Sequence, residues 1–177
     1  MIRFLLLLSL TALLSCAQPN YQHLDPQFDV ETHFGGERHA YGVVRSRGGE
    51  LLRRFKVNLT GVWEGDRGIL DEEFLYDDGE RSSRQWVFEK HSDGRWVGRA
   101  NDALTDAQLV INGPELNLVY EMVLEVDGTQ YEVTFEDWIY AIDDERVVNV
   151  SEVRKFGFKV AEVILVIDRN HIDLTSF

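Results

Sequence analysis

The chain has 177 residues, a formal net charge of −13 and one cysteine. A lone cysteine excludes an internal disulfide, so the fold must depend on a buried core, for which this length suffices in one domain. The acidic excess argues against binding to nucleic acid, because a phosphate backbone is recognised by basic clusters.

The amino-terminal segment has the pattern of a bacterial lipoprotein signal. Arg3 precedes an apolar run from Phe4 to Leu14 that is too short to span a membrane as a helix. Cys16 follows Leu-Leu-Ser and resembles a lipobox cysteine, which is acylated and then becomes the first residue of the mature protein. We expect a cleaved signal peptide at residues 1–15 and attachment to the membrane through acyl chains, such as palmitate, on Cys16. An uncleaved anchor or a buried amino-terminal helix is the alternative.

Residues 16–27 are predicted to form a flexible tether. They contain two of the three prolines and little apolar periodicity, and an extended segment of this length reaches about 35 Å. Ala17 follows the cysteine, whereas lipoproteins retained in the inner membrane usually have Asp at this position. The sequence therefore favours the outer membrane, with the protein facing the periplasm.

Residues 28–177 are predicted to form a single all-β domain. Apolar and polar residues alternate through most of this segment, and turn signals separate the alternating runs. These signals are Gly35-Gly36, Gly48-Gly49, Asp78-Gly79, Asp93-Gly94, Asn112-Gly113 and Asp127-Gly128. Long strands joined by tight turns favour an up-and-down antiparallel barrel of about eight to ten strands. A helical stretch, at most a brief one, is expected near Asp102–Asp106.

A two-residue turn at Asp127-Gly128 predicts the register of a long hairpin in which Leu118 faces Asp137. One face of this hairpin is apolar and the other acidic, which specifies the register. Asp137 is the exception in the apolar row, and a carboxylate there must be paired, hydrogen-bonded or protonated. We expect it to be shielded from solvent, either in a structural hydrogen-bond network or as a polar anchor inside a ligand pocket.

The partner of Asp137 is expected on the following strand. Two sets of side chains on that strand could face inward, and the first set suits a carboxylate better. The first set is Asn149, Ser151 and Lys155, and the second is Val148, Val150 and Arg154.

The hairpin around Asp78-Gly79 predicts a second inward polar group. A three-residue loop at 77–79 makes Glu72 face Arg84 and groups the large apolar side chains on the same face. A two-residue loop would instead make Glu73 face Arg84. Either register gives Arg84 a carboxylate, and a buried pair of this kind more often fixes one packing than adds stability.

The sequence contains no complete catalytic or metal-binding motif. His33 and His39 flank Gly35-Gly36 and could approach each other across a hairpin, but a third ligand is not apparent. Signatures of serine nucleophiles and phosphate-binding loops are absent from the sequence. We therefore predict no metal, no cofactor and no assigned catalytic residue.

Several segments, in this order and spacing, resemble a family of bacterial lipoproteins known as domain of unknown function 3833. The segments are Gly42–Gly48, Arg53–Phe55, Glu72–Glu80, Arg84–Trp86, Glu136–Tyr140, Asn149–Ser151 and Lys155–Gly157. The resemblance covers about Phe34 to Ile167 and implies a lipocalin-like or related closed β fold in the cell envelope, with no assigned activity. The chain departs from the family pattern at Gly113–Tyr120 and Ala103–Asp106, so a pocket shaped by these segments would differ here.

Three functions are consistent with this sequence. It favours a non-enzymatic binding or carrier module for an acyl chain or another apolar molecule, held in a barrel cavity. The alternative is a structural or accessory lipoprotein with a filled barrel that acts through an unidentified protein partner. The third is a hydrolase or isomerase that uses Asp137 and neighbouring carboxylates. The predicted ligand-contacting residues are Arg54, Glu72, Arg84, Trp86, Tyr120, Asp137, Trp138 and Lys155.

Arg84, Arg54 and Lys155 are the candidate inward cations for the carboxylate of a fatty acid. Glu72 is predicted to face Arg84 and to pair with its charge, which leaves Arg84 less available to a ligand carboxylate. The sequence therefore favours a neutral ester or a phospholipid tail over a free fatty acid.

Overall fold

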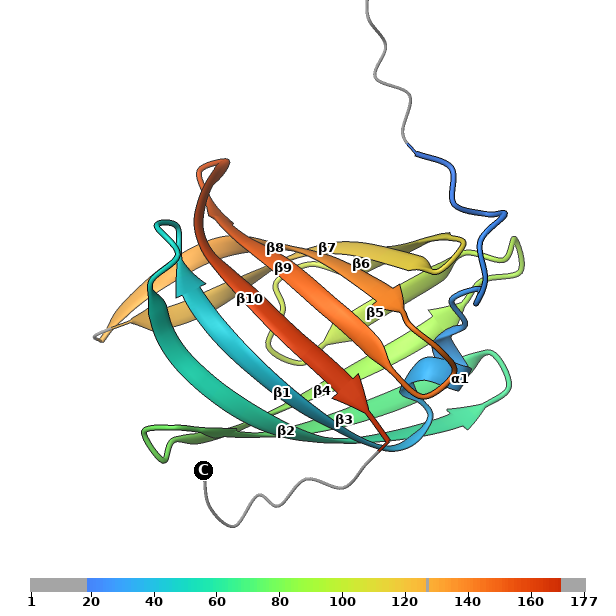
Figure 1. Ribbon diagram of the computed structural model, residues 1–177, viewed down its shortest axis with the longest axis horizontal. Coiled ribbons are helices and arrows are strands. Elements are labelled where there is room, and N and C mark those ends of the chain that lie inside the picture. The colour runs from blue at the N-terminus through green and yellow to red at the C-terminus, as the bar shows by residue number, and fades with distance from the viewer. Residues whose placement is uncertain (1–18, 127, 170–177) are drawn as a thin grey trace, which may run out of the picture.

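A computed structural model describes residues 19–126 and 128–169, which form a closed antiparallel barrel with a short helix at one end (Figure 1). The helix is α1 (Val30–Phe34). The strands are β1 (Gly36–Ser46), β2 (Leu51–Glu64), β3 (Arg67–Tyr76), β4 (Arg81–Lys90), β5 (Trp96–Ala100), β6 (Ala107–Asn112), β7 (Glu115–Val126), β8 (Thr129–Ala141), β9 (Val147–Lys155) and β10 (Phe158–Asp168).

The strands follow one another around the barrel in chain order, and β10 pairs with β1 to close it. The predicted up-and-down antiparallel barrel is therefore confirmed. Along each strand, alternate side chains point into the barrel, which is the period of a pleated strand. Strands β5 and β6 are short, so β5 pairs with β4 at Trp86–Lys90 only, and β6 pairs with β7 at Glu115–Val119 only. Among the described residues, no helix is long and apolar enough to cross a bilayer.

Both predicted hairpin registers are present. In the β7–β8 hairpin, Val126 faces Thr129 and Leu118 faces Asp137. In the β3–β4 hairpin, Glu72 faces Arg84, as the three-residue loop requires. In both cases the register that collects the large apolar side chains on the inner face is the one that forms, because a slip of one residue would turn them all to solvent.

Helix α1 closes one end of the barrel, which we call the closed end. Asp29 caps the helix by accepting a hydrogen bond from the backbone N–H of Thr32. Phe34 is buried and stacks on Phe88 of β4, with ring centroids 5.8 Å apart. The carbonyl of Phe34 lies against the Cα of Gly61 on β2, where any side chain would collide with it. This close approach lets the helix enter the barrel.

Two expectations about local structure differ from the fold. The segment near Asp102–Asp106 is a loop whose Ala103 forms a bridge with Met122, and its polar groups bond to β7 rather than to a helix of their own. The predicted tether is described from Pro19 onward, and there it contacts the barrel. Asn112, at the end of β6, bonds to the carbonyl of Pro19 and to the N–H of Tyr21. Cys16 and the predicted signal peptide lie outside the described residues.

Candidate functional site

The barrel encloses a cavity of about 650 Å³. A volume of this size is within the range of about 300–1,000 Å³ that small-molecule sites occupy. Side chains near the β1–β2, β3–β4 and β7–β8 turns line one end of the cavity, among them Leu52, Glu80 and Val126. These turns lie at the end of the barrel opposite α1, which we call the mouth (Figure 1).

Packed aromatic rings form part of the cavity wall at the level of Tyr120 and Phe135, which face each other on β7 and β8. Trp86 stacks on Phe88 at 5.7 Å and meets the edge of Tyr120 at 5.1 Å. Tyr120 in turn stacks on Phe135 at 5.4 Å. Such contacts give a rigid apolar surface, because Trp86 and Tyr120 are each held by two neighbouring rings.

A group of polar side chains interrupts the apolar wall halfway along the barrel. We call it the polar belt; it consists of Glu72, Arg84, Asp102, Tyr120, Asp137, Asn149 and Ser151. On one side of the belt, Nε of Arg84 donates to both carboxylate oxygens of Asp102, at 2.9 and 3.0 Å. Glu72 faces Arg84 from the adjacent strand. The sequence predicted Glu72 as the partner of Arg84, but Asp102 receives these hydrogen bonds because the loop after β5 brings it over the guanidinium.

On the other side of the belt, Asp137 is 5% exposed. It faces Ser151 across β8 and β9, and Ser151 lies 3.5 Å from Asn149 Oδ1. The predicted burial of Asp137 is therefore confirmed, and Asn149 and Ser151 of the first predicted set face inward. The Oδ1 atom of Asp137 is buried and has no hydrogen-bond partner among the described residues.

Burial controls the protonation of the belt. It raises the pKa of Glu72 to about 7; the charge of Arg84 opposes this shift, and those of Asp102 and Asp137 add to it. It also raises the pKa of Asp137 to about 6, against the positive charge of Arg84 and hydrogen bonding to the carboxyl group from Ser151, Tyr120 and Asn149. Both carboxyl groups therefore exchange protons close to neutral pH, although neither ordinarily would.

Burial also raises the pKa of the Tyr120 hydroxyl well above its usual value, and the charge of Asp137 adds to this effect. For Arg84, burial lowers the pKa, but the negative charges around the guanidinium outweigh it and raise the pKa overall. Tyr120 therefore stays a hydrogen-bond donor, and Arg84 stays charged at every physiological pH.

The mouth has its own ionic contacts. Arg53 donates to Asp78 at 2.8 Å and to Glu80 at 2.7 Å, and its guanidinium lies 3.6 Å from the ring centroid of Tyr76. Lys155 Nζ lies 3.9 Å from the ring centroid of Tyr131. Within the described lining of the cavity, the cations are therefore Arg53 and Arg84, and both are bound to carboxylates.

The predicted ligand-contacting residues separate into three groups. Those that line the cavity are Glu72, Arg84, Trp86, Tyr120 and Asp137. Lys155 lies at the mouth, as the last residue of β9. Arg54 and Trp138 were expected to face inward, but they are neighbours of the inward Phe55 and Asp137 and so point outward, by the alternation of a strand.

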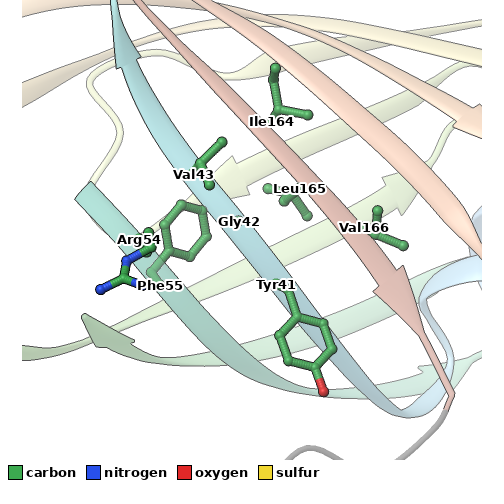
Figure 2. Close-up of a pocket in the computed structure, with 8 residues that line it drawn as sticks. All are labelled: Tyr41, Gly42, Val43, Arg54, Phe55, Ile164, Leu165 and Val166. Carbon is green, nitrogen blue, oxygen red and sulfur yellow. The ribbon is translucent and has the colours of Figure 1, made fainter. Parts of the chain in front are cut away.

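Figure 2 shows Arg54 and Phe55 pointing in opposite directions from β2. Together with Tyr41, Ile164 and Val166, Arg54 borders a hollow of about 380 Å³ on the outer wall, across β1 and β10. Arg54 donates from Nε to Asp77 at 2.9 Å on this outer side. It is therefore not a candidate for contact with a ligand in the barrel.

The two histidines considered as metal ligands are separated. His33 belongs to α1 and bonds to the carbonyl of Asp29, whereas His39 lies on β1 next to Asn58, with 2.7 Å between its Nδ1 and Asn58 Oδ1. Gly35 ends the helix instead of forming a hairpin, which removes the expected approach. Among the described residues, no three His, Cys, Asp or Glu side chains are grouped as a metal site.

Comparison with solved structures finds other barrels. A redesigned β-barrel, mFAP0, solved bound to DFHBI, has 8% sequence identity and a TM-score of 0.42; the match covers 77% of this chain and 98% of that one. Odorant Binding Protein OBP1 has 17% identity and a TM-score of 0.35; the match covers 85% of this chain and 80% of that one. The fold assignment rests on the strand pairing of this chain itself.

Comparison with curated protein sequences gives no match. A family profile described as protein of unknown function, DUF3833, matches residues 7–169. This range includes the whole barrel and all the sequence segments, from Gly42–Gly48 to Lys155–Gly157, by which the chain resembles that family. The chain belongs to the DUF3833 family.

Proposed function

We propose that this protein binds an apolar small molecule, such as a lipid acyl chain, inside the barrel and that it does so as a non-enzymatic carrier or binding module. The observation that carries the proposal is the cavity of about 650 Å³, whose wall is largely apolar apart from the polar belt and polar side chains toward the mouth, such as Arg53, Glu80 and Ser82. A barrel with a purely structural role would fill this space with side chains, because an empty apolar volume forfeits packing contacts.

The charges of the cavity favour a ligand without a carboxylate. Arg84 is bound by Asp102, and Arg53 by Asp78 and Glu80. A fatty acid anion would need to displace one of these partners and would approach further carboxyl groups. A neutral lipid avoids this cost, since burial of its chain contributes about 25 cal/mol per Å² of apolar surface removed from water.

The test is ligand binding by the delipidated protein. We expect saturable binding of a fluorescent neutral lipid analogue and weaker binding of a fluorescent free fatty acid. Native mass spectrometry of gently purified protein is expected to show a lipid-sized adduct. Absence of binding by both probes would reject the proposal in favour of a structural role.

A pair of variants on one strand locates the binding site. Val163 lines the cavity on β10, and Val166 on the same strand points outward and is 41% exposed. Val163→Trp adds volume inside the cavity and is expected to abolish probe binding. Val166→Trp adds the same side chain outside and is expected to leave the affinity unchanged.

We further propose that the barrel is anchored to the outer membrane by acyl chains on Cys16 and faces the periplasm. The lipobox-like sequence and Ala17 support this proposal. Labelling of cells with a clickable fatty acid tests it, because the Cys16→Ser protein is expected to carry no label. Label retained on that variant would exclude acylation at Cys16.

One observation favours a second candidate function, acid–base catalysis such as an isomerisation. Asp137 and Glu72 line the cavity, and burial raises the pKa of each toward neutrality, as general acids and bases require. If a lipid incubated with the wild-type protein is chemically altered, as chromatography and NMR of the extracted lipid would show, and the same lipid incubated with Asp137→Asn is not, the protein is an enzyme.

A further inference from the structure

Asp137 is a buried side chain with an unused hydrogen-bond acceptor in the cavity wall. It is 5% exposed, and its Oδ1 has no partner among the described residues. A buried acceptor left unpaired costs stability. A ligand that donates a hydrogen bond at this point would supply the missing partner.

The polar belt around Asp137 contains more negative than positive groups. Its carboxyl groups are those of Glu72, Asp102 and Asp137, and its one cation is Arg84. Arg84 is held by Asp102, with hydrogen bonds of 2.9 and 3.0 Å. Glu72 and Asp137 therefore have no cation of their own hydrogen-bonded to them among the described residues.

We propose that the polar belt binds the protonated amine of an amphipathic ligand, whose apolar chain occupies the rest of the cavity. This inference rests on the proposed binding of an apolar chain and adds the chemistry of its headgroup. The ammonium would donate to Asp137 Oδ1 and lie next to the Glu72 carboxylate. Its positive charge offsets the negative excess of the belt.

Other headgroups fit the belt less well. A carboxylate or phosphate brings another negative charge next to three carboxyl groups, and it has no donor for Asp137. A hydroxyl can donate to Asp137 but leaves the charge of the belt unbalanced. An ammonium has three donors and a full charge, and hydrogen bonds of charged groups are roughly twice as strong as neutral ones.

The proposal makes binding depend on pH in a defined direction. The groups that face Asp137 are Tyr120 on β7, Asn149 and Ser151 on β9, and Glu72, Arg84 and Asp102 across the cavity. Of these, Glu72 and Asp137 gain or lose protons near neutral pH. An ammonium stabilises their ionised forms, so it binds more tightly as pH rises from about 5 to 8 and releases protons on binding.

The experiment compares three probes with the same chain: dodecylamine, dodecanol and dodecanoate. Isothermal titration calorimetry of the delipidated protein gives each affinity, and buffers of different ionisation enthalpy give the protons released. We expect dodecylamine to bind about tenfold more tightly than dodecanol at pH 8, and dodecanoate to bind most weakly. Proton release is expected with the amine alone, in titrations near pH 6.5, where Asp137 and Glu72 are still partly protonated.

Asp137→Asn keeps the shape of the side chain and removes its charge, so it is expected to abolish the preference for the amine and to leave dodecanol binding in place. Glu132→Gln removes one charge from the exposed face of the same strand and should keep the preference. If Asp137→Asn does not fold, Glu72→Gln provides the same comparison.

Two results distinguish the failure of this inference from that of the proposed function. Dodecanol binding as tightly as dodecylamine, or dodecanoate binding more tightly, would reject the amine site and leave the binding barrel standing. If none of the three probes binds, both proposals are wrong.

Discussion

At the scale of single residues, the carboxyl group of Asp137 couples the stability of the barrel to pH. The pKa of Asp137 is raised from 3.8 in an unfolded chain to about 6 in the barrel, so the folded state binds the proton more tightly. The stabilisation linked to this proton is complete below about pH 4 and is lost as pH rises through about 6. Glu72 acts in the same direction, with a pKa raised from 4.5 to about 7.

Asp137→Asn should therefore stabilise the empty barrel at high pH and not at low pH. Since one unit of pKa shift corresponds to about 1.4 kcal/mol, the shift from 3.8 to about 6 predicts a gain of about 3 kcal/mol at pH 8 and almost none at pH 4. Urea unfolding at the two pH values measures it. Glu132→Gln is the control, and equal effects of Asp137→Asn at both pH values would contradict the linkage.

At the scale of structural elements, the β9–β10 turn departs from the usual chemistry of tight hairpins. Its residues are Phe156 and Gly157, with φ of 51° and 80°. Two-residue turns with positive φ at both positions favour Asn-Gly, because a bulky side chain is strained there. Phe156 is 89% exposed, so burial of its ring does not offset this strain.

Phe156→Asn is expected to raise the free energy of unfolding by about 1 kcal/mol, which is the order of the penalty for an ordinary residue in the left-handed region. Thermal or urea unfolding measures the change. Phe158→Asn is the control, because Phe158 is also exposed, at 69%, but begins a strand. A similar gain from both variants would show that removal of exposed apolar surface, and not relief of strain, is the cause.

The contact between α1 and β2 depends on the absence of a side chain at Gly61. A methyl group there would collide with the backbone carbonyl of Phe34, which cannot turn aside as a side chain could. Gly61→Ala is expected to cost more than about 2 kcal/mol and to increase hydrogen exchange in α1. Gly48→Ala, where the nearest atom is an ordinary 3.7 Å away, should leave both unchanged. Intact protection of α1 in Gly61→Ala would contradict this account.

Elements joined by tight turns could be predicted from the sequence, and elements placed by long-range packing could not. The turns at Asp78-Gly79 and Asp127-Gly128 fix which residues face each other, so Asp137 could be assigned to the interior without a structure. Asp102 could not be assigned to the belt, because its loop has no alternation of apolar and polar residues from which a side-chain direction could be inferred. Its position depends instead on the contact of the loop with β7. Arg54 could have been excluded from the cavity lining by sequence alone, since its neighbour Phe55 and the next alternate residue Val57 are both apolar, and both are buried in the structure.

At the scale of the whole molecule, the barrel has two unlike ends. Helix α1 and the β6–β7 turn form the closed end, and the described chain begins there, where Pro19 and Tyr21 contact Asn112 (Figure 1). Cys16 is three residues before Pro19 in the sequence, a distance of roughly 10 Å at full extension. If Cys16 is acylated, the closed end must lie next to the membrane and the mouth must point away from it. A ligand would then enter and leave through the aqueous side.

This orientation can be measured with dyes placed at the two ends of the acylated protein in vesicles. Because Cys16 is the single native cysteine and would carry the lipid, a new cysteine is the one free thiol. A dye on Phe156→Cys, at the mouth, is expected to be quenched by aqueous iodide and not by brominated lipid. A dye on Asp144→Cys, in the β8–β9 turn at the closed end, is expected to be quenched by brominated lipid more strongly.

The Cys16→Ser background should remove the lipid quenching of both dyes, because the barrel then has no anchor. Stronger lipid quenching at position 156 than at position 144 would show that the mouth faces the bilayer, which a short tether at the closed end cannot allow.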